Sequence, residues 1–335
     1  MRVGAKRGTA VSESLASLRR KIDGARDLRS VVSTMKALAA ASIGQYEKSV
    51  RALEDYYHTV QLGLSACLRA DMPSSPMLPV GGQKIKQGTG VTGAVIFGSD
   101  QGLVGQFNDT VTDYAVQALT ALPGRKKIWA VGGRVHDRLA DRNLREDLQV
   151  AGFFPVPLSV KGITPLVGQI LMEIVVPGLE EGKAQGRKGG RNRLVQLYLF
   201  YNSTRPETLH DPVHRRLLPL DETWRRELAA IPWPAKCLPE VMGGSAATLH
   251  ALIREYLFVS LFRACAESLA SENASRLAAM ERAEKNIDQL SADLRQTFHR
   301  LRQSRIDEEL FDVIAGVEAL AGASRAARGQ GDGWD

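Results

Sequence analysis

The chain has 335 residues, a length that suits one large domain or two ordinary ones. It is 44% hydrophobic but only 6% aromatic, and its net charge of +7 with a pI near 9.4 permits acidic partners, nucleic acid or an anionic membrane surface without selecting among them. Three cysteines without C-x-x-C spacing argue against a disulfide framework or a zinc site, and no apolar run approaches the ~20 residues that span a bilayer.

The first predicted element is a helix over residues 12–68, a stretch with almost no helix breakers. Apolar side chains recur along it in steps of three and four, with one stammer between Ala25 and Leu28, as in a coiled coil. The predicted seam consists of Leu15, Leu18, Ile22, Ala25, Leu28, Val31, Met35 and Leu38. Small residues from Ala39 to Gly44 follow and would let another backbone approach closely.

The middle of the chain alternates between strand-like and helix-like patterns. Residues 71–90 are rich in Pro, Gly and Ser and predict a linker. In residues 91–240, the apolar runs VTGAVIF, KKIWAVG, LQVAGFF and LVQLYLFYN predict strands, with helical patterns between them. This alternation predicts a Rossmann-like α/β domain with a mostly parallel sheet. The basic segment 183–193 is low in hydrophobicity, and we expect a mobile surface insertion there.

A second long helix is predicted over residues 241–321, followed by a disordered tail over residues 322–335. Its seam consists of Met280, Ala283, Ile287, Leu290, Leu294, Phe298 and Leu301, and then Ile306, Leu310, Val313, Val317 and Leu320. At 1.5 Å per residue the two helices would extend roughly 80 Å and 115 Å, more than a compact domain of this size can cover. Each helix therefore needs a partner, and the simplest partner is the other helix.

The middle loop GSDQGLVGQFN invites a nucleotide-binding interpretation, because its glycines could bring backbone N–H groups and a helix N-terminus toward phosphate. It is neither G-x-G-x-x-G nor a phosphate loop, since no Lys-Ser/Thr pair follows. A tight strand-to-helix connection that needs glycine explains it better. Asp100 in this loop could be a catalytic acid in principle, although a cap or turn residue is the commoner role.

Other candidate chemistry is sparse. His210 and His214 form an i, i+4 pair, but Pro212 between them argues against a helix, and we expect a solvated loop pair rather than zinc ligands. No serine lies in a G-x-S-x-G elbow. The basic clusters at residues 19–21 and 300–305 suit a solvated helix face or nucleic acid, but no aromatic interleaving supports the second choice. We expect no catalytic residue, no cofactor and no metal.

Three stretches together resemble the γ subunit of F-type ATP synthases, the rotating central stalk. They are LRRKIDGARDLRSVVSTMKALAAAS, the loop GSDQGLVGQFN, and the C-terminal pair SLASENASRLAAMERAEKN and RLRQSRIDEELFDVIAGVEAL. The resemblance implies an antiparallel coiled coil that projects from the α/β domain into a hexamer of α and β subunits. It also implies that the globular part joins the ε subunit and the c ring, that the chain is not itself catalytic, and that it binds no nucleic acid.

The resemblance also assigns contact residues for the β subunits. Met35 matches a methionine of the family's first helix, Arg302 and Gln303 match an Arg-Gln pair opposite it, and Glu309 matches a nearby glutamate. The family's acidic catch loops suit an arginine donor. This chain departs from the family pattern at Lys36, Gln101, Val104, Gln106, His299 and Asp307, which implies a divergent bacterial branch. The implied location is peripheral, on the cytoplasmic face of the bacterial inner membrane, with membrane contact only through the complex.

Two alternatives come from other classes of protein. One is a nucleotide-dependent α/β enzyme with helical extensions, which would bind ATP or NAD as the isolated chain. The other is a basic coiled-coil scaffold, possibly on nucleic acid, which would bind DNA in a strongly salt-dependent way.

Overall fold

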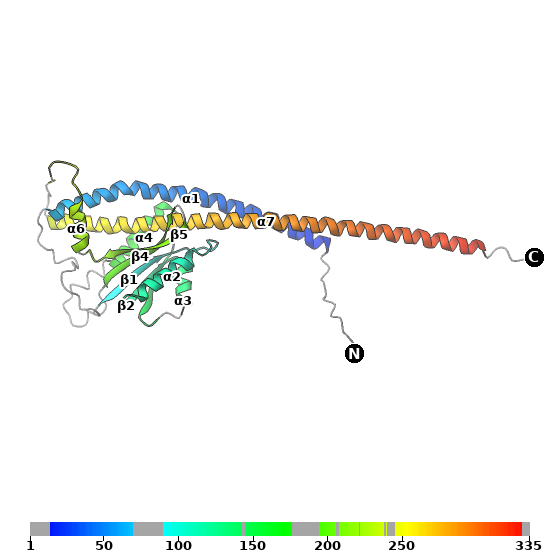
Figure 1. Ribbon diagram of the computed structural model, residues 1–335, viewed down its shortest axis with the longest axis horizontal. Helices are drawn as coiled ribbons and strands as arrows, with labels where there is room; N and C mark the ends of the chain where they lie inside the picture. The colour runs from blue at the N-terminus through cyan, green and yellow to red at the C-terminus, as the bar shows by residue number, and fades with distance from the viewer. Residues whose placement is uncertain are drawn as a thin grey trace, which may run out of the picture. The chain divides into compact units, whose positions relative to one another are not determined.

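The structure is a computed structural model that describes residues 14–69, 90–142, 145–175, 194–205, 208–220, 222–237, 239 and 245–329. It divides into two compact units: unit 1 runs up to Met35 and resumes at Met280, and unit 2 is Lys36–Ala279. Helices α1 (Leu15–Arg69) and α7 (Ser245–Gly329) contribute to both units (Figure 1). None of the helices in the described part of the chain combines the length and the apolar character that crossing a bilayer requires.

The two long helices are confirmed, with a correction at the C-terminal end. Helix α7 has 85 residues and ends at Gly329, so residues 322–329 of the predicted tail are helical. Ala-rich sequence with two arginines favours helix there. Residues 330–335, the linker over residues 71–89 and the insertion 183–193 lie outside the described residues.

Contacts between α1 and α7 show how the two helices pair, and those within unit 2 show that they run antiparallel. In unit 2 the Tyr56 hydroxyl donates a 2.8 Å hydrogen bond to Glu255, and the Gly63 position lies against Leu252. In unit 1 the Arg29 guanidinium lies 2.7 Å from the Asp288 carboxylate. Within unit 2, partner numbers on α7 rise as those on α1 fall, which confirms the antiparallel pair that the resemblance implies.

Unit 2 contains a five-stranded mixed sheet in the order β3-β2-β1-β4-β5. Its strands are β1 (Val91–Phe97), β2 (Arg125–Val131), β3 (Leu148–Phe154), β4 (Leu194–Arg205) and β5 (Thr208–Leu218), and only β4 and β5 pair antiparallel. The first four strands match the apolar runs of the sequence. Strand β5 does not, because it is a polar edge strand containing Pro212, and it places His210 and His214 on a strand rather than in the predicted loop.

Helices cover both faces of this sheet, as Figure 1 shows. Besides α1 and α7, the described residues of unit 2 form α2 (Phe107–Thr120), α3 (Gly133–Ala140), α4 (Val160–Ile170) with the π-turn η1 (Leu171–Val175), and α6 (Glu222–Ala230). Val95 and Phe97 of β1 join the core beneath α1, α4 and α7, whereas Ala94 and Ile96 join the core beneath α2 and α3. Strand β1 is therefore buried on both faces, which explains its uninterrupted apolar sequence.

The seam of the helix pair differs from the predicted one on α1. Leu18 and Ala25 are buried as predicted, but Leu28 and Val31 of unit 1 are 58% and 56% exposed, and Val32 takes the inner position. Arg29 occupies the heptad position between Ala25 and Val32, so the steps stay regular and the predicted stammer is wrong. The apolar pattern gave the wrong residues because the heptad position that a leucine usually holds is here a half-exposed arginine, paired with Asp288.

The seam on α7 needs a similar correction in unit 1. Met280 is buried, and Ile287, Leu294 and Phe298 are half-buried, as predicted. Leu290 is instead 51% exposed, and the neighbouring Ser291 is half-buried in its place. A small side chain there lets the two backbones approach. The later members of the predicted seam are also exposed, so the prediction is wrong for Leu301, Ile306, Leu310, Val313 and Val317.

Candidate partner-binding surface

The structure places the four predicted contact residues at two separate levels of unit 1. Met35 on α1 is half-buried, whereas Arg302, Gln303 and Glu309 on α7 are exposed. Because Arg29 pairs with Asp288, Met35 lies beside a point on α7 that is about 20 residues, or about 30 Å, before Arg302. The Arg-Gln pair is thus not opposite Met35 in this chain, although all four residues belong to unit 1.

Around Arg302, unit 1 carries a strongly basic band, which consists of residues 14–29 of α1 and 290–305 of α7. These two stretches contain nine Lys or Arg and only three Asp residues, in a chain whose total net charge is +7. The exposed arginines at its centre are Arg19, Arg20, Arg295, Arg300, Arg302 and Arg305. A band of this kind attracts carboxylates, and guanidinium groups can hold them with two hydrogen bonds each.

Beyond the basic band, residues 306–318 of α7 form what we call the terminal segment. It continues past the first residues of α1 within unit 1 (Figure 1), and every residue in it is exposed. Large apolar side chains are among them, including Leu310 at 57%, Phe311 at 70% and Val317 at 62% exposure. An isolated helix does not leave this much apolar surface in water without a binding function.

In the glycine loop of unit 2, the carboxylate of Asp100 lies where a dinucleotide-binding fold would hold a phosphate. Asp100 accepts hydrogen bonds of 2.8 Å from the backbone N–H groups of Gly133, at the start of α3, and of Val156. A helix N-terminus after β2 is an anion site, and Asp100 supplies the anion. The cap role of Asp100 is therefore confirmed, and the loop is a structural connection.

Glycine is required at two positions beside this loop because backbones pass close together. Gly132 has φ of +109°, and a Cβ atom there would lie 2.8 Å from the backbone nitrogen of Ser99. A Cβ atom on Gly98 would lie 2.1 Å from a methyl carbon of Val135. The glycines thus serve the packing of the loop against α3.

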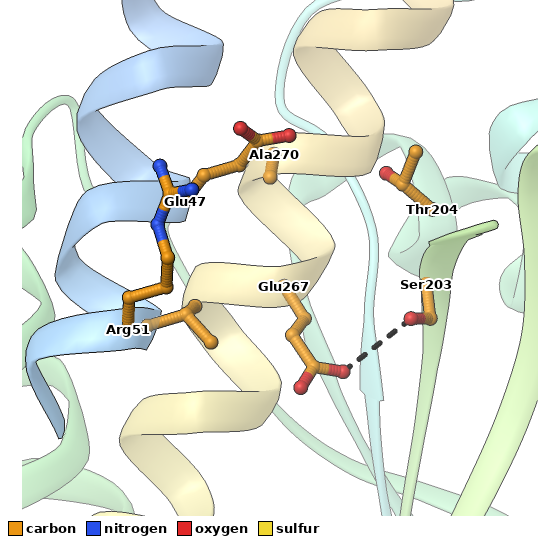
Figure 2. Close-up of a pocket in the computed structure, with 7 residues that line it drawn as sticks. Glu47, Arg51, Ser203, Thr204, Glu267 and Ala270 are labelled. Atoms are coloured by element: carbon orange, nitrogen blue, oxygen red, sulfur yellow. Dashed lines mark hydrogen bonds between the residues drawn. The ribbon is translucent and has the colours of Figure 1, made fainter. Parts of the chain in front are cut away.

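A polar pocket of about 390 Å³ lies in unit 2 between α1, β4 and α7 (Figure 2). Figure 2 shows Glu47 and Arg51 on one side and Glu267 with Ser203 on the other. The Glu267 carboxylate accepts a 2.7 Å hydrogen bond from Arg263 Nε and a 3.5 Å hydrogen bond from Ser203 Oγ. Its charge is therefore satisfied by Arg263 of the same helix and by Ser203 of β4, and the pocket is part of the packing of α7 on the sheet. Among the described residues, no group of His, Cys, Asp or Glu has the arrangement of a metal site.

A buried ion pair that the sequence did not single out lies in the small-residue part of α7. Arg276 donates a 2.6 Å hydrogen bond to Glu272, and Glu272 is only 5% exposed. Burial raises the pKa of the Glu272 carboxyl, and Arg276 counteracts this. The available signal was a charged pair at i, i+4 inside ESLASENASRLAAM, where the neighbouring positions are small or apolar.

These features define a class of protein: a long antiparallel helix pair combined with a small doubly wound α/β domain. Two solved structures share this fold. A chain from the Euglena gracilis mitochondrial ATP synthase, in an OSCP/F1/c-ring structure, aligns with a TM-score of 0.61 at 16% identity, covering 96% of this chain and 99% of that one. A rotor chain from the same organism gives 0.56 at 15% identity, covering 87% and 98%.

A family model described as ATP synthase matches residues 14–320, and the chain belongs to that family. Curated relatives are ATP synthase gamma chains. The one from Granulibacter bethesdensis is 27% identical over 315 residues, covering 92% of this chain and 99% of the relative. The one from Salinibacter ruber is 27% identical over 324 residues, covering 92% and 98%. The one from Brevibacillus brevis is 24% identical over 315 residues, covering 93% and 100%.

Proposed function

We propose that this chain is the rotor subunit of an F-type ATP synthase or ATPase. In this role it turns inside a hexamer of α and β subunits and couples ion flow through the membrane sector to ATP synthesis or hydrolysis at the β sites. Membership of the ATP synthase family and the names of the relatives support the proposal. The shared fold with a chain of an ATP synthase rotor structure is consistent with it.

The observation that carries the proposal is the contrast between the inside and the outside of the helix pair in unit 1. Leu18, Ala25 and Met280 are buried between the helices, which stiffens the pair against twisting. The outside presents the basic band and the exposed terminal segment. A shaft that transmits torque needs a stiff seam and an exterior that engages a surrounding ring.

In this proposal Arg302 and Gln303 contact acidic loops of the β subunits, and Met35 and Glu309 contact the same subunits at other levels of the shaft. Exposure of Arg302, Gln303 and Glu309 makes these contacts possible without unfolding. The guanidinium of Arg302 can bind a carboxylate with two hydrogen bonds, and Gln303 can add an amide donor. Rotation of the shaft would then move the acidic loop of each β subunit in turn.

The proposal also assigns the rest of the complex. Unit 2 joins the ε subunit and the ring of c subunits, and the chain itself is a non-catalytic subunit that holds no cofactor. We infer a peripheral position on the cytoplasmic face of a bacterial inner membrane, where contact with the bilayer is made only through the complex. The basic surface of the chain then faces protein partners and not nucleic acid.

Reconstitution with the cognate α and β subunits tests the proposal. The chain alone should hydrolyse no ATP, and adding it should restore coupled turnover to the other subunits. In the complete complex, the double variant Arg302→Ala with Gln303→Ala should lower the ions pumped per ATP several-fold. Arg254→Ala, which removes an exposed arginine of α7 from unit 2, is the matched control and should leave pumping unchanged.

Two outcomes would contradict the proposal, one in its rotor function and the other only in its assigned contact. Equal ATPase rates with and without the chain would rule out the rotor function itself. Unaltered pumping by the double variant, with normal pumping by the control, would rule out only the assignment of Arg302 and Gln303 as contact residues. Saturable binding of ATP or NAD by the isolated chain would instead favour the enzyme alternative.

A further inference from the structure

His299 of α7 is the one histidine of the basic band. Its side chain is exposed, and it lies one helical turn before Arg302 and Gln303, the pair proposed to contact the β subunits. Steps of three and four residues return a side chain to nearly the same face of a helix, so the imidazole lies between Arg302 and Gln303 in projection along the axis. The three side chains therefore present one continuous surface to a partner.

The face of α7 that carries His299 is not the face that binds α1. Leu294 and Phe298 are half-buried in the seam, and His299 is turned from Phe298 by about 100° around the helix axis. The rings of Phe298 and His299 have centroids 5.9 Å apart and an interplanar angle of 76°. This edge-on contact with a seam residue restrains the imidazole and leaves it exposed on the outside of the helix pair.

The charged side chains that surround this imidazole on α1 and α7 are cationic. Because Arg29 lies beside Asp288 in the antiparallel pair, residues 14–22 of α1 lie beside residues 294–306 of α7. Neither stretch contains an Asp or a Glu. Their cations are Arg295, Arg300, Arg302 and Arg305 of α7 and Arg19, Arg20 and Lys21 of α1. A carboxylate that pairs with a protonated His299 must therefore come from a partner subunit.

We propose that His299 is a further contact residue for the acidic loops of the β subunits and makes this contact depend on pH. The inference rests on the proposed rotor function and adds its regulation. A neutral imidazole donates one hydrogen bond, whereas a protonated imidazole donates two and carries a positive charge. Histidine gains this proton between about pH 8 and about pH 5, where carboxylates remain largely ionised. The affinity of the shaft for an acidic loop therefore rises as the pH falls.

This contact would add a grip that Arg302 alone does not provide. A guanidinium stays charged at every pH at which the chain is folded, so its attraction for a carboxylate does not change between pH 8 and pH 5. The imidazole beside it adds a charge only in the acidic part of that range. The ring then holds the shaft more tightly in acid than at neutral pH.

Binding of the full-length chain to the assembled ring of α and β subunits tests the proposal. His299→Asn keeps an uncharged side chain at every pH, and His299→Arg keeps a charged one. At pH 6 the parent chain should bind about fivefold more tightly than His299→Asn, and at pH 8 the two should agree within about twofold. His299→Arg should bind about fivefold more tightly than His299→Asn at both pH values. High salt should reduce these differences.

Two controls separate this contact from other effects of pH. Comparing parent and variant at the same pH cancels any titration of the ring itself. His58→Asn removes an exposed histidine of α1 in unit 2 and should keep the full pH dependence of the parent chain. Urea unfolding of His299→Asn should have the midpoint of the parent chain, and a lower midpoint would assign His299 to the fold instead.

The possible results separate the inference from the proposed function. If the parent chain does not bind the ring at either pH, the rotor function fails. If it binds and His299→Asn shows the same ratio of affinities between pH 6 and pH 8, the inference is wrong and the rotor function stands. A loss of affinity that is equal at both pH values would make His299 a contact without pH dependence, which also overturns the proposed regulation.

Discussion

Unit 2 and unit 1 handle their polar and apolar groups in opposite ways. In unit 2, Lys126 is buried with its ammonium paired to Asp147, and Asp100 receives two backbone N–H groups. Apolar side chains of its sheet fill two cores, one on each face. In unit 1, the terminal segment exposes apolar and acidic side chains together, and the basic band lies in water.

This difference separates the residues that stabilise the fold from those that bind partners. A substitution of a buried or hydrogen-bonded residue in unit 2 removes a contact within the chain and changes the free energy of unfolding. A substitution of an exposed residue in unit 1 leaves that free energy within about 0.5 kcal/mol and changes only what the complex does. Substitutions at four sites of the chain test this separation of roles.

The largest effect is expected at the buried ion pair of α7. Glu272→Ala should destabilise the isolated chain by about 3–5 kcal/mol, because it leaves the guanidinium of Arg276 largely buried without its carboxylate. Replacing both residues with methionine removes both charges and should be close to neutral. Urea unfolding of the two variants, monitored by circular dichroism, measures the difference. Equal losses of stability in both would mean that the packing of the two side chains matters and their charges do not.

Tyr201 should give the next effect, in alkaline solution. Burial raises its pKa to about 12, and the nearby Glu267 carboxylate adds to the rise. A pKa raised on folding contributes stability below the ordinary value of about 10, and this is lost as pH rises through the folded value. Tyr201→Phe should therefore lessen the fall in stability between about pH 9 and about pH 11. It should also remove one of the high-pH tyrosinate steps in an ultraviolet titration of the folded chain, and a titration unchanged by the substitution would contradict this.

Asp100 should have a smaller effect. Asp100→Ala removes the acceptor for Gly133 and Val156, and we expect a loss of about 1–3 kcal/mol in the free energy of unfolding. Asp55→Ala, at an exposed carboxylate of α1, is the control and should stay within about 0.5 kcal/mol. If Asp100→Ala were as mild as the control while creating a measurable affinity for phosphate, the donors would be an anion site that Asp100 only shields.

The sequence predicted the parts of the fold that depend on apolar pattern and missed those that depend on paired polar groups. Strands β1 and β3 coincide with the apolar runs VTGAVIF and LQVAGFF. Strand β5 escaped prediction because an edge strand keeps charged residues and a proline. The seam over Leu28 and Val31 was wrong because the half-buried apolar residue is Val32, and a half-exposed Arg29 paired with Asp288 stands at the heptad position before it.

For the candidate surface, the sequence identified the residues but not their positions relative to one another. Arg302, Gln303 and Glu309 were picked out by resemblance, and the structure places all three on the exposed face of one helix. Their distance from Met35 could not be predicted, because the register of α1 on α7 is set by contacts between residues far apart in the chain. Met35 and the other three residues remain predicted contacts.

The smallest effect is expected for the ion pair between α1 and α7 in unit 1. Arg29 and Asp288 lie 2.7 Å apart, but their side chains are 55% and 51% exposed, so water screens the attraction. A double-mutant cycle with Arg29→Ala and Asp288→Ala should give a coupling of less than about 1 kcal/mol in the free energy of unfolding. In the complete complex the same variants should alter the pumping ratio more than they alter stability, since a slip of the helices would misplace Arg302 against the ring. A coupling above about 2 kcal/mol would show that unit 1 stabilises the fold through its own contacts, and the separation between the two units would then fail.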